Sequence, residues 1–134
     1  MKRWAICYVS SASPAIEETD INEVLSWTQS WNTDHNITGF LLYSEGNFFQ
    51  VLEGDELKVK DVFQKIEKDR RHRNLFKIFN REIKQDQYDE YSCEFLSKYN
   101  ESEELNENYY LQYLKNLDHS SQTAVKNILK AFVD

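Results

Sequence analysis

Apolar residues recur at every second position near the start of the chain, as in a strand, and then at every third or fourth position, as in a helix. Residues 3–10 alternate as a strand does, which places Tyr8 and Cys7 on opposite faces. Residues 20–32 repeat apolar side chains every three or four positions, as an amphipathic helix does. Its expected inward stripe is Ile21, Val24, Leu25, Thr28 and either Trp31 or Asn32. Asp20 followed by Glu23 is a carboxylate form of the capping box, so we expect this helix to begin at Asp20.

The following segments predict a hairpin, a second helix and two further strands. Residues 37–43 and 48–53 read as strands joined by a tight turn at Ser44-Glu45-Gly46-Asn47. A helix follows Gly54-Asp55 and ends near Arg70, and residues 75–83 and 90–96 read as strands. The order β-α-β-β-α-β-β, with right-handed crossovers, favours a ferredoxin-like α+β sandwich. We therefore expect a five-stranded mixed sheet with both helices on one face.

The C-terminal part has a different character. A polar, acidic stretch at 100–106 is followed by apolar residues at helical spacing over 106–117, many of them tyrosines, and again over 124–132. We expect residues 1–97 to form the main domain and residues 98–134 a two-helix extension. These helices would cover the other face of the sheet, present a surface for association, or do both.

Composition and charge narrow the function classes. With 134 residues and 40% hydrophobic content, the chain is long enough for one domain with its own core. The net charge of −7 argues against a nucleic-acid surface, and the longest apolar runs, about five residues, are too short for a membrane span. The chain has two cysteines, Cys7 and Cys93, which are too few for a disulfide framework. Its N-terminus shows no signal region, so we expect a cytoplasmic protein. The three histidines have no ligand-like spacing, which argues against a metal site.

Polar side chains among apolar neighbours mark a candidate binding site. Val24, Thr28 and Asn32 form one row along the first helix, running from apolar to hydroxyl to amide. If the faces that carry Tyr8 and Gln50 point at the helices, a phenol and two primary amides converge between sheet and helices. A buried amide without a partner costs about 1–3 kcal/mol, so either the protein or a ligand must pair with it.

Each of these residues also has an ordinary structural interpretation. Tyr8 alone would be a core tyrosine with a paired hydroxyl, and Asn32 a residue at a helix C-terminus. Gln50 alone could pair with backbone. Arg71 and His72 alone would be a solvated helix end, although their basic cluster is large enough to meet one phosphate group.

The spaced motifs together resemble those of the BLUF family, blue-light sensors that hold a flavin between two helices on a ferredoxin-like sheet. The resemblance runs from Ile6 to Phe95. The motifs that carry it are Tyr8-Val9-Ser10, Asn32, Ile37-Thr38-Gly39, the run from Gly46 to Gly54, and the run from Ile66 to His72.

The resemblance implies roles for the residues at the expected flavin ring. Tyr8 would give an electron and a proton to the photoexcited flavin, and Gln50 would bridge Tyr8 and the ring and change its orientation or tautomer. Asn32 would hold the carbonyl and imide edge of the ring. Val24 and Ile66 would lie on its two faces.

The resemblance also implies a phosphate side and two departures from the family. Arg71 and His72 would meet the ribityl-phosphate side of FAD or FMN, bound noncovalently, with Asp69 orienting them. Cys93 stands where the family usually has methionine, and Tyr91 where tryptophan is common. These positions are expected to relay the light-induced change at the flavin into the sheet. We therefore expect the two replacements to affect the route of the signal and the rate of dark recovery. Tyr91 and Trp31 are further candidate electron donors.

The resemblance therefore implies a short, stand-alone blue-light receptor without catalytic turnover. Its output would pass by association to a downstream protein partner or within a homo-oligomer. Two alternatives remain open from the residues: a flavin-free regulatory or oligomerisation module on the same fold, and a redox flavoenzyme. A visible spectrum before and after blue illumination separates all three.

Overall fold

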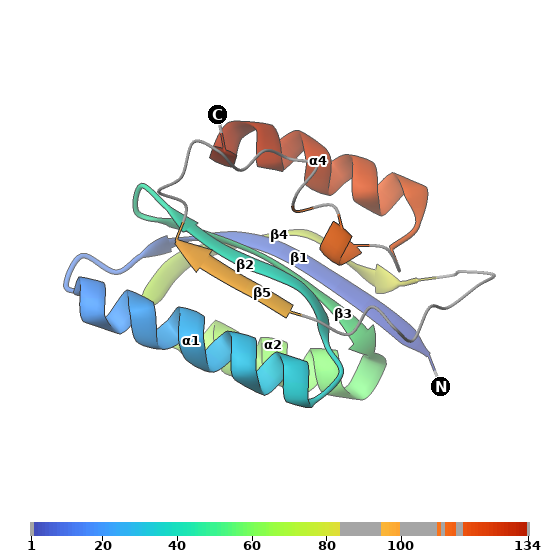
Figure 1. The fold of residues 1–134 in the computed structure, drawn as a ribbon, viewed down its shortest axis with the longest axis horizontal. Helices are drawn as coiled ribbons and strands as arrows, with labels where there is room; N and C mark the ends of the chain where they lie inside the picture. The colour runs from blue at the N-terminus through green and yellow to red at the C-terminus, as the bar shows by residue number, and fades with distance from the viewer. Residues whose placement is uncertain (1, 84–94, 100–109, 111, 115–116, 134) are drawn as a thin grey trace.

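The computed structural model describes residues 2–83, 95–99, 110, 112–114 and 117–133. Five strands form one sheet in the order β4-β1-β3-β2-β5 (Figure 1). Their bounds are Arg3–Ala12 (β1), Thr38–Ser44 (β2), Asn47–Asp55 (β3), His72–Glu82 (β4) and Phe95–Tyr99 (β5). All neighbouring pairs are antiparallel except β2 and β5, which are parallel. This confirms the predicted five-stranded mixed sheet.

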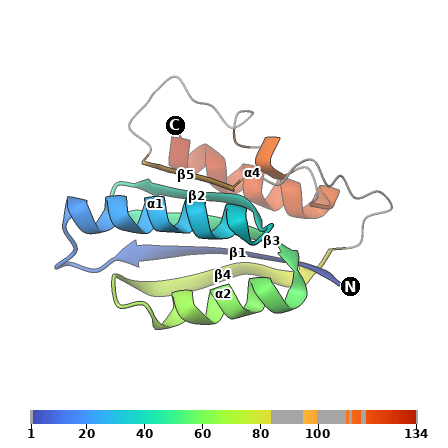
Figure 2. The same cartoon turned by 60° about the horizontal axis from the view of Figure 1, so that its bottom comes forward.

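Helices cover both faces of the sheet. The helices α1 (Glu18–Asp34) and α2 (Glu56–Lys68) lie on one face, as predicted, and α4 (His119–Val133) lies on the other (Figures 1 and 2). Helix α1 packs over β2 and β5, whereas α2 packs over β1 and β3. The two helices therefore flank the central strand β3.

The predicted start of the first helix is wrong by two residues. Helix α1 begins at Glu18, its N-cap residue is Glu17, and the backbone N–H of Glu17 donates to the Asp20 carboxylate at 3.1 Å. Asp20 therefore occupies the third helical position of the box and not the cap. A carboxylate can serve at either position, so the sequence pattern alone was ambiguous.

Two C-terminal predictions fall partly outside the described residues. Strand β5 begins at Phe95 and continues to Tyr99, whereas the first five positions of the expected strand 90–96 lie outside the described part of the chain. The same holds for most of the tyrosine-rich helix expected at 106–117, of which the described part contains a 3-10 turn at Gln112–Leu114. The boundary near residue 97 stays a prediction.

The β2–β3 hairpin has a two-residue turn that fixes its register. Glu45 and Gly46 both have positive φ, 49° and 82°, and Ser44 pairs with Asn47 across them. Positive φ at both central residues is the mark of a type I′ turn. Within β2, Gly39 has a φ of 124°, and a Cβ there would collide with the Val51 carbonyl of β3, so this position requires glycine.

Two apolar cores result, one on each side of the sheet. The outer core joins strand residues such as Cys7 and Phe49 to Val125 and Leu129 of α4. The inner core joins Tyr8 and its neighbours to α1 and α2. The predicted alternation of β1 is therefore confirmed, and α4 shields an apolar sheet face. None of the helices in the described part is long and apolar enough to cross a bilayer.

Candidate functional site

A cavity of about 950 Å³ opens between α1 and α2 above the sheet. Most of the residues predicted for the binding site contribute to its walls. These are Tyr8, Val24, Thr28, Gln50, Ile66, Asp69, Arg71 and His72. The structure therefore brings together side chains from β1, β3 and both helices. His72 contributes as the first residue of β4, which begins three residues before the strand expected at 75–83.

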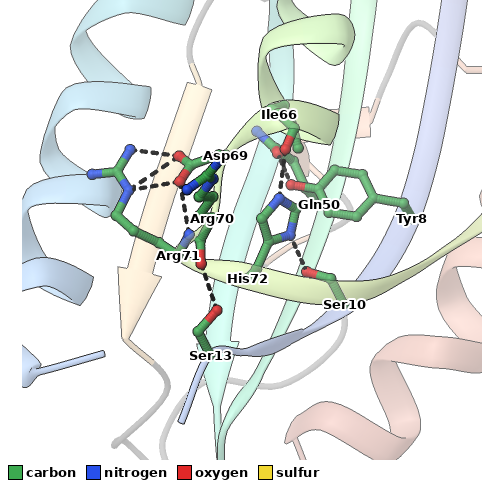
Figure 3. Close-up of polar contacts among 9 residues, drawn as sticks. All are labelled: Tyr8, Ser10, Ser13, Gln50, Ile66, Asp69, Arg70, Arg71 and His72. Atoms are coloured by element: carbon green, nitrogen blue, oxygen red, sulfur yellow. Dashed lines mark hydrogen bonds and ion pairs between the residues drawn. The ribbon is translucent and has the colours of Figure 1, made fainter. Parts of the chain in front are cut away.

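The floor of the cavity contains a row of three residues on adjacent strands. Tyr8 of β1 lies directly opposite Gln50 of β3, which lies directly opposite Leu41 of β2. The Tyr8 hydroxyl donates to Gln50 Oε1 at 2.5 Å (Figure 3). Gln50 is only 1% exposed, yet its Nε2 has no partner among the described residues. A buried amide donor thus lies at the cavity floor without an acceptor among the described residues, and a ligand in the cavity can supply one.

The Tyr8 phenol stays protonated at neutral pH. Burial raises the Tyr8 pKa far above its ordinary value, and the negative charges of Asp69 and of an ionised Cys7 raise it further. Burial also raises the Cys7 pKa. The phenol is therefore a neutral hydrogen-bond donor, and any proton it gives up must go to a group inside the cavity.

Among the predicted binding residues in the described part of the chain, Asn32 alone does not line the cavity. It is fully buried on α1, one turn beyond Thr28, and neither atom of its carboxamide has a hydrogen-bond partner among the described residues. Of the two alternatives for the end of the inward stripe, Asn32 is the buried residue, whereas Trp31 is half-buried and lines the cavity.

An ion pair lies at one end of the cavity. The Arg71 guanidinium donates to both carboxylate oxygens of Asp69, with the shortest contact, from Nη2 to Oδ2, at 2.6 Å (Figure 3). Burial alone would raise the Asp69 pKa, but hydrogen bonds from Arg71 and the charges of Arg71 and His72 outweigh it, so the pKa lies below its usual value. The hydrogen bond to Asp69 raises the Arg71 pKa. Asp69 therefore holds the Arg71 guanidinium, whereas the hydrogen bonds of the His72 ring go to other residues, and the expected role of the three at a phosphate stays a prediction.

His72 is held on both sides of its ring. Its Nε2 lies 2.6 Å from the Ile66 carbonyl oxygen, and its Nδ1 lies 2.8 Å from the Ser10 hydroxyl (Figure 3). A carbonyl only accepts, so Nε2 carries a proton and donates to it, and Nδ1 shares a hydrogen bond with the Ser10 hydroxyl, which can donate or accept. Both nitrogens are thus engaged within the protein, and His72 joins the end of α2 to β1.

Sequence reasoning missed several cavity residues. Trp27 and Lys65 line the cavity from the two helices, and Leu41 lines its floor. Leu41 could have been found, because the two-residue turn at Glu45-Gly46 places residue 41 opposite residue 50. Tyr91 and Cys93, expected to relay the signal, lie outside the described residues. Among the described residues no group of His, Cys, Asp or Glu is arranged to hold a metal ion.

Comparisons with known proteins relate the chain to light receptors. It is 34% identical over 74 residues to the photoactivated adenylate cyclase subunit alpha of Euglena gracilis, covering 55% of this chain and 7% of that protein. It is 38% identical over 58 residues to the blue light- and temperature-regulated antirepressor BluF of Escherichia coli K12, covering 43% of this chain and 14% of that protein. The matched regions are thus a small fraction of these longer relatives.

The fold agrees with this relationship. The solved structure of BlrP1 BLUF superposes with a TM-score of 0.72 and 21% identity, covering 99% of this chain and 90% of that one. The family model of BLUF, described as sensors of blue-light using FAD, matches residues 4–94. This match spans more than half of the sequence, and the chain therefore belongs to the BLUF family of blue-light-sensing flavoproteins.

Proposed function

We propose that this protein senses blue light with a noncovalently bound FAD, and that the Tyr8–Gln50 pair converts absorption into a changed hydrogen-bond pattern. The observation that carries the proposal is the floor of the cavity. There a neutral phenol donates to one end of a buried amide, whose other end has no partner within the described residues.

The residues of the cavity suit a flavin. A volume of about 950 Å³ lies near the top of the range of about 300–1,000 Å³ typical of ligand pockets. Val24 and Ile66 supply apolar walls for a flat ring, and the unpaired amide of Gln50 at the floor suits a ring nitrogen or carbonyl. Asn32, whose amide is also unpaired, does not line the cavity, and we propose that it meets the carbonyl and imide edge of the ring when flavin is bound. Arg71 offers a cation for a phosphate. FAD is the flavin that the description of the family names.

A bound flavin would supply the absorption of blue light and an acceptor for one electron and one proton. Tyr8 would give both through its hydroxyl and take them back in the dark. After it has lost the proton, the Tyr8 oxygen can only accept, so Gln50 Oε1 no longer has a donor there. The Gln50 carboxamide can satisfy the new pattern by rotation, which presents its NH2 group to Tyr8 and its oxygen to the cavity. It can also do so by a tautomer change, which presents an O–H group to Tyr8 and leaves the nitrogen toward the cavity.

The sheet offers a route for the output. Gln50 lies between Phe49 and Val51, whose side chains belong to the outer core together with those of α4. A shift of β3 at Gln50 would therefore reach the sheet face that α4 covers, with Tyr91 and Cys93 as the proposed relay positions. We propose that this region passes the signal to a protein partner or a second copy of the chain in the cytoplasm, and that the chain itself turns over no substrate.

An absorption experiment tests the proposal. The purified protein should be yellow, and blue light should shift its visible spectrum reversibly to slightly longer wavelength. Tyr8→Phe and Gln50→Ala should each lose the shift while flavin is still bound. Tyr43→Phe is the matched control, because Tyr43 is also buried on the inner face but does not line the cavity. It should keep the shift.

Other outcomes would favour the alternatives. Bleaching together with steady oxidation of reduced nicotinamide would indicate a redox flavoenzyme. A colourless protein that gains no stability from added FAD would indicate a flavin-free module. Retention of the full shift in Tyr8→Phe or in Gln50→Ala would remove that residue from the mechanism.

A further inference from the structure

Helix α1 carries a column of stacked aromatic rings beside the cavity. Trp27, Trp31 and His35 follow one another at steps of four residues, which places them on one face of the helix. The indole rings of Trp27 and Trp31 are stacked with centroids 5.9 Å apart and an interplanar angle of 22°. The rings of Trp31 and His35 are stacked at 3.7 Å and 11°. Both tryptophans line the cavity, and Trp27 is 55% exposed.

We propose that Trp31 and Trp27 form an electron relay between the cavity and solvent, through which a small thiol reduces the bound flavin under illumination. This activity is distinct from the reversible Tyr8–Gln50 reaction, and it rests on the proposed function because it requires a flavin in the cavity. The stacked pair provides a continuous path of oxidisable rings from the cavity wall to the protein surface.

The electrons and protons of this reaction balance. In each light-driven step, Trp31 loses one electron to the flavin, Trp27 restores it, and a thiol restores Trp27 while releasing its proton. Two such steps deliver two electrons and, from solvent, two protons to the flavin, and the two oxidised thiols join as one disulfide. The flavin becomes reduced and its yellow colour is lost.

The surroundings of the two indoles direct the positive charge outward. The ammonium group of Lys65 lies 5.4 Å from the centroid of the Trp31 ring, so a cationic Trp31 would be repelled by it. Trp27 is exposed, and water stabilises a charge there. The oxidised site therefore moves from Trp31 to Trp27, where a solute can reach it.

His35 holds the inner indole in place. Its Nδ1 lies 2.7 Å from the Trp31 carbonyl oxygen and must donate to it, which fixes the imidazole against the Trp31 ring. Tyr8 differs in that it is only 3% exposed and paired with Gln50. An oxidised Tyr8 is out of reach of a thiol and recovers its electron from the flavin, so that pathway stays reversible.

The third tryptophan of the chain supplies a matched control. Trp4 lies on β1, its Nε1 donates to Asn80 Oδ1 at 2.6 Å, and it does not line the cavity. We would illuminate wild type, Trp31→Phe, Trp27→Phe and Trp4→Phe without oxygen and with dithiothreitol, and record the loss of visible absorbance per bound flavin. Wild type and Trp4→Phe should bleach at the same rate, and the two relay variants should lose the fast thiol-dependent phase. Bleaching of Trp27→Phe at the wild-type rate would overturn the relay.

A second measurement needs no flavin. Two stacked indoles give an exciton couplet in the far-ultraviolet circular dichroism of the full chain freed of flavin. The couplet should be present in wild type and Trp4→Phe and absent in both relay variants, and its survival in either relay variant would contradict the stacking. A wild-type protein without a reversible red shift would defeat the proposed function. A normal shift with equal bleaching in all variants would defeat only the relay.

Discussion

Removing the Tyr8 hydroxyl should destabilise the protein by an amount that depends on Gln50. Tyr8→Phe keeps the ring but deletes the donor to Gln50 Oε1, and both side chains are almost completely buried. A buried acceptor left without a donor costs about 1–3 kcal/mol. We expect the free energy of unfolding of Tyr8→Phe to fall by that amount.

A second variant turns this cost into a test of the bond itself. Gln50→Leu leaves the Tyr8 hydroxyl without its partner, whereas the double variant Tyr8→Phe/Gln50→Leu removes both polar ends. Because replacing both partners by apolar groups of similar shape is close to neutral, the double variant should be less destabilised than the sum of the single variants. The expected coupling is about 1–3 kcal/mol, within the range measured for contacting residues.

Urea unfolding of the full chain freed of flavin, followed by circular dichroism, measures all four proteins. Flavin must be absent, because a ligand that binds only the folded state adds a stabilisation that depends on each variant's affinity. The slopes with urea should agree among the variants, which shows that the unfolded states are comparable. Additivity within about 0.5 kcal/mol would show that Tyr8 and Gln50 do not share a bond and would refute the reasoning.

Three further predictions concern other parts of the structure. Gly39→Ala should lower the free energy of unfolding by at least about 1–3 kcal/mol, because its φ of 124° favours glycine and the added methyl meets the neighbouring strand; equal urea midpoints for variant and wild type would contradict this. The pKa of Asp69 is lower in the folded protein than its unfolded value of about 3.9, so ionised Asp69 stabilises the folded state above that pH. This stabilisation is lost as the pH falls through the folded-state pKa. Wild type should therefore lose more stability below about pH 4 than Asp69→Asn does. If the free energy of unfolding falls equally with pH in both proteins, the ion pair between Asp69 and Arg71 does not stabilise the folded state. In a Cys93→Ser variant the remaining Cys7 is fully buried and its pKa is raised, so a thiol reagent should react only after denaturation; rapid labelling of the folded variant would count against this burial.

Local patterns in the sequence determined the elements of this fold and much of the site. Alternation in β1 placed Tyr8 and Cys7 on opposite faces, and the structure confirms it. The two-residue turn at Glu45-Gly46 fixes the register of its hairpin and so sets Leu41 against Gln50. These features depend on neighbouring residues only, which is why a sequence pattern can predict them.

Other features could not follow from local patterns. The sequence predicts a start of α1 at Asp20, whereas the helix begins at Glu18, because a carboxylate serves either at the cap or three residues after it and only the folded helix distinguishes the two positions. The Trp27–Trp31 stack depends on how α1 is rotated over the sheet, since helical spacing alone brings several side-chain pairs close.

The sequence by itself determined the strand and helix order, the two faces of β1 and the polar residues available for a flavin site. Tertiary structure alone decided that Tyr8 lies opposite Gln50, 42 residues later in the chain, and that Asn32 is buried beyond the cavity lining. The physical reason is that the register between β1 and β3 must bury the apolar side chains of both sheet faces at the same time, and this depends on the whole fold. A shift of one residue would move Tyr8 or Gln50 to the face that α4 covers.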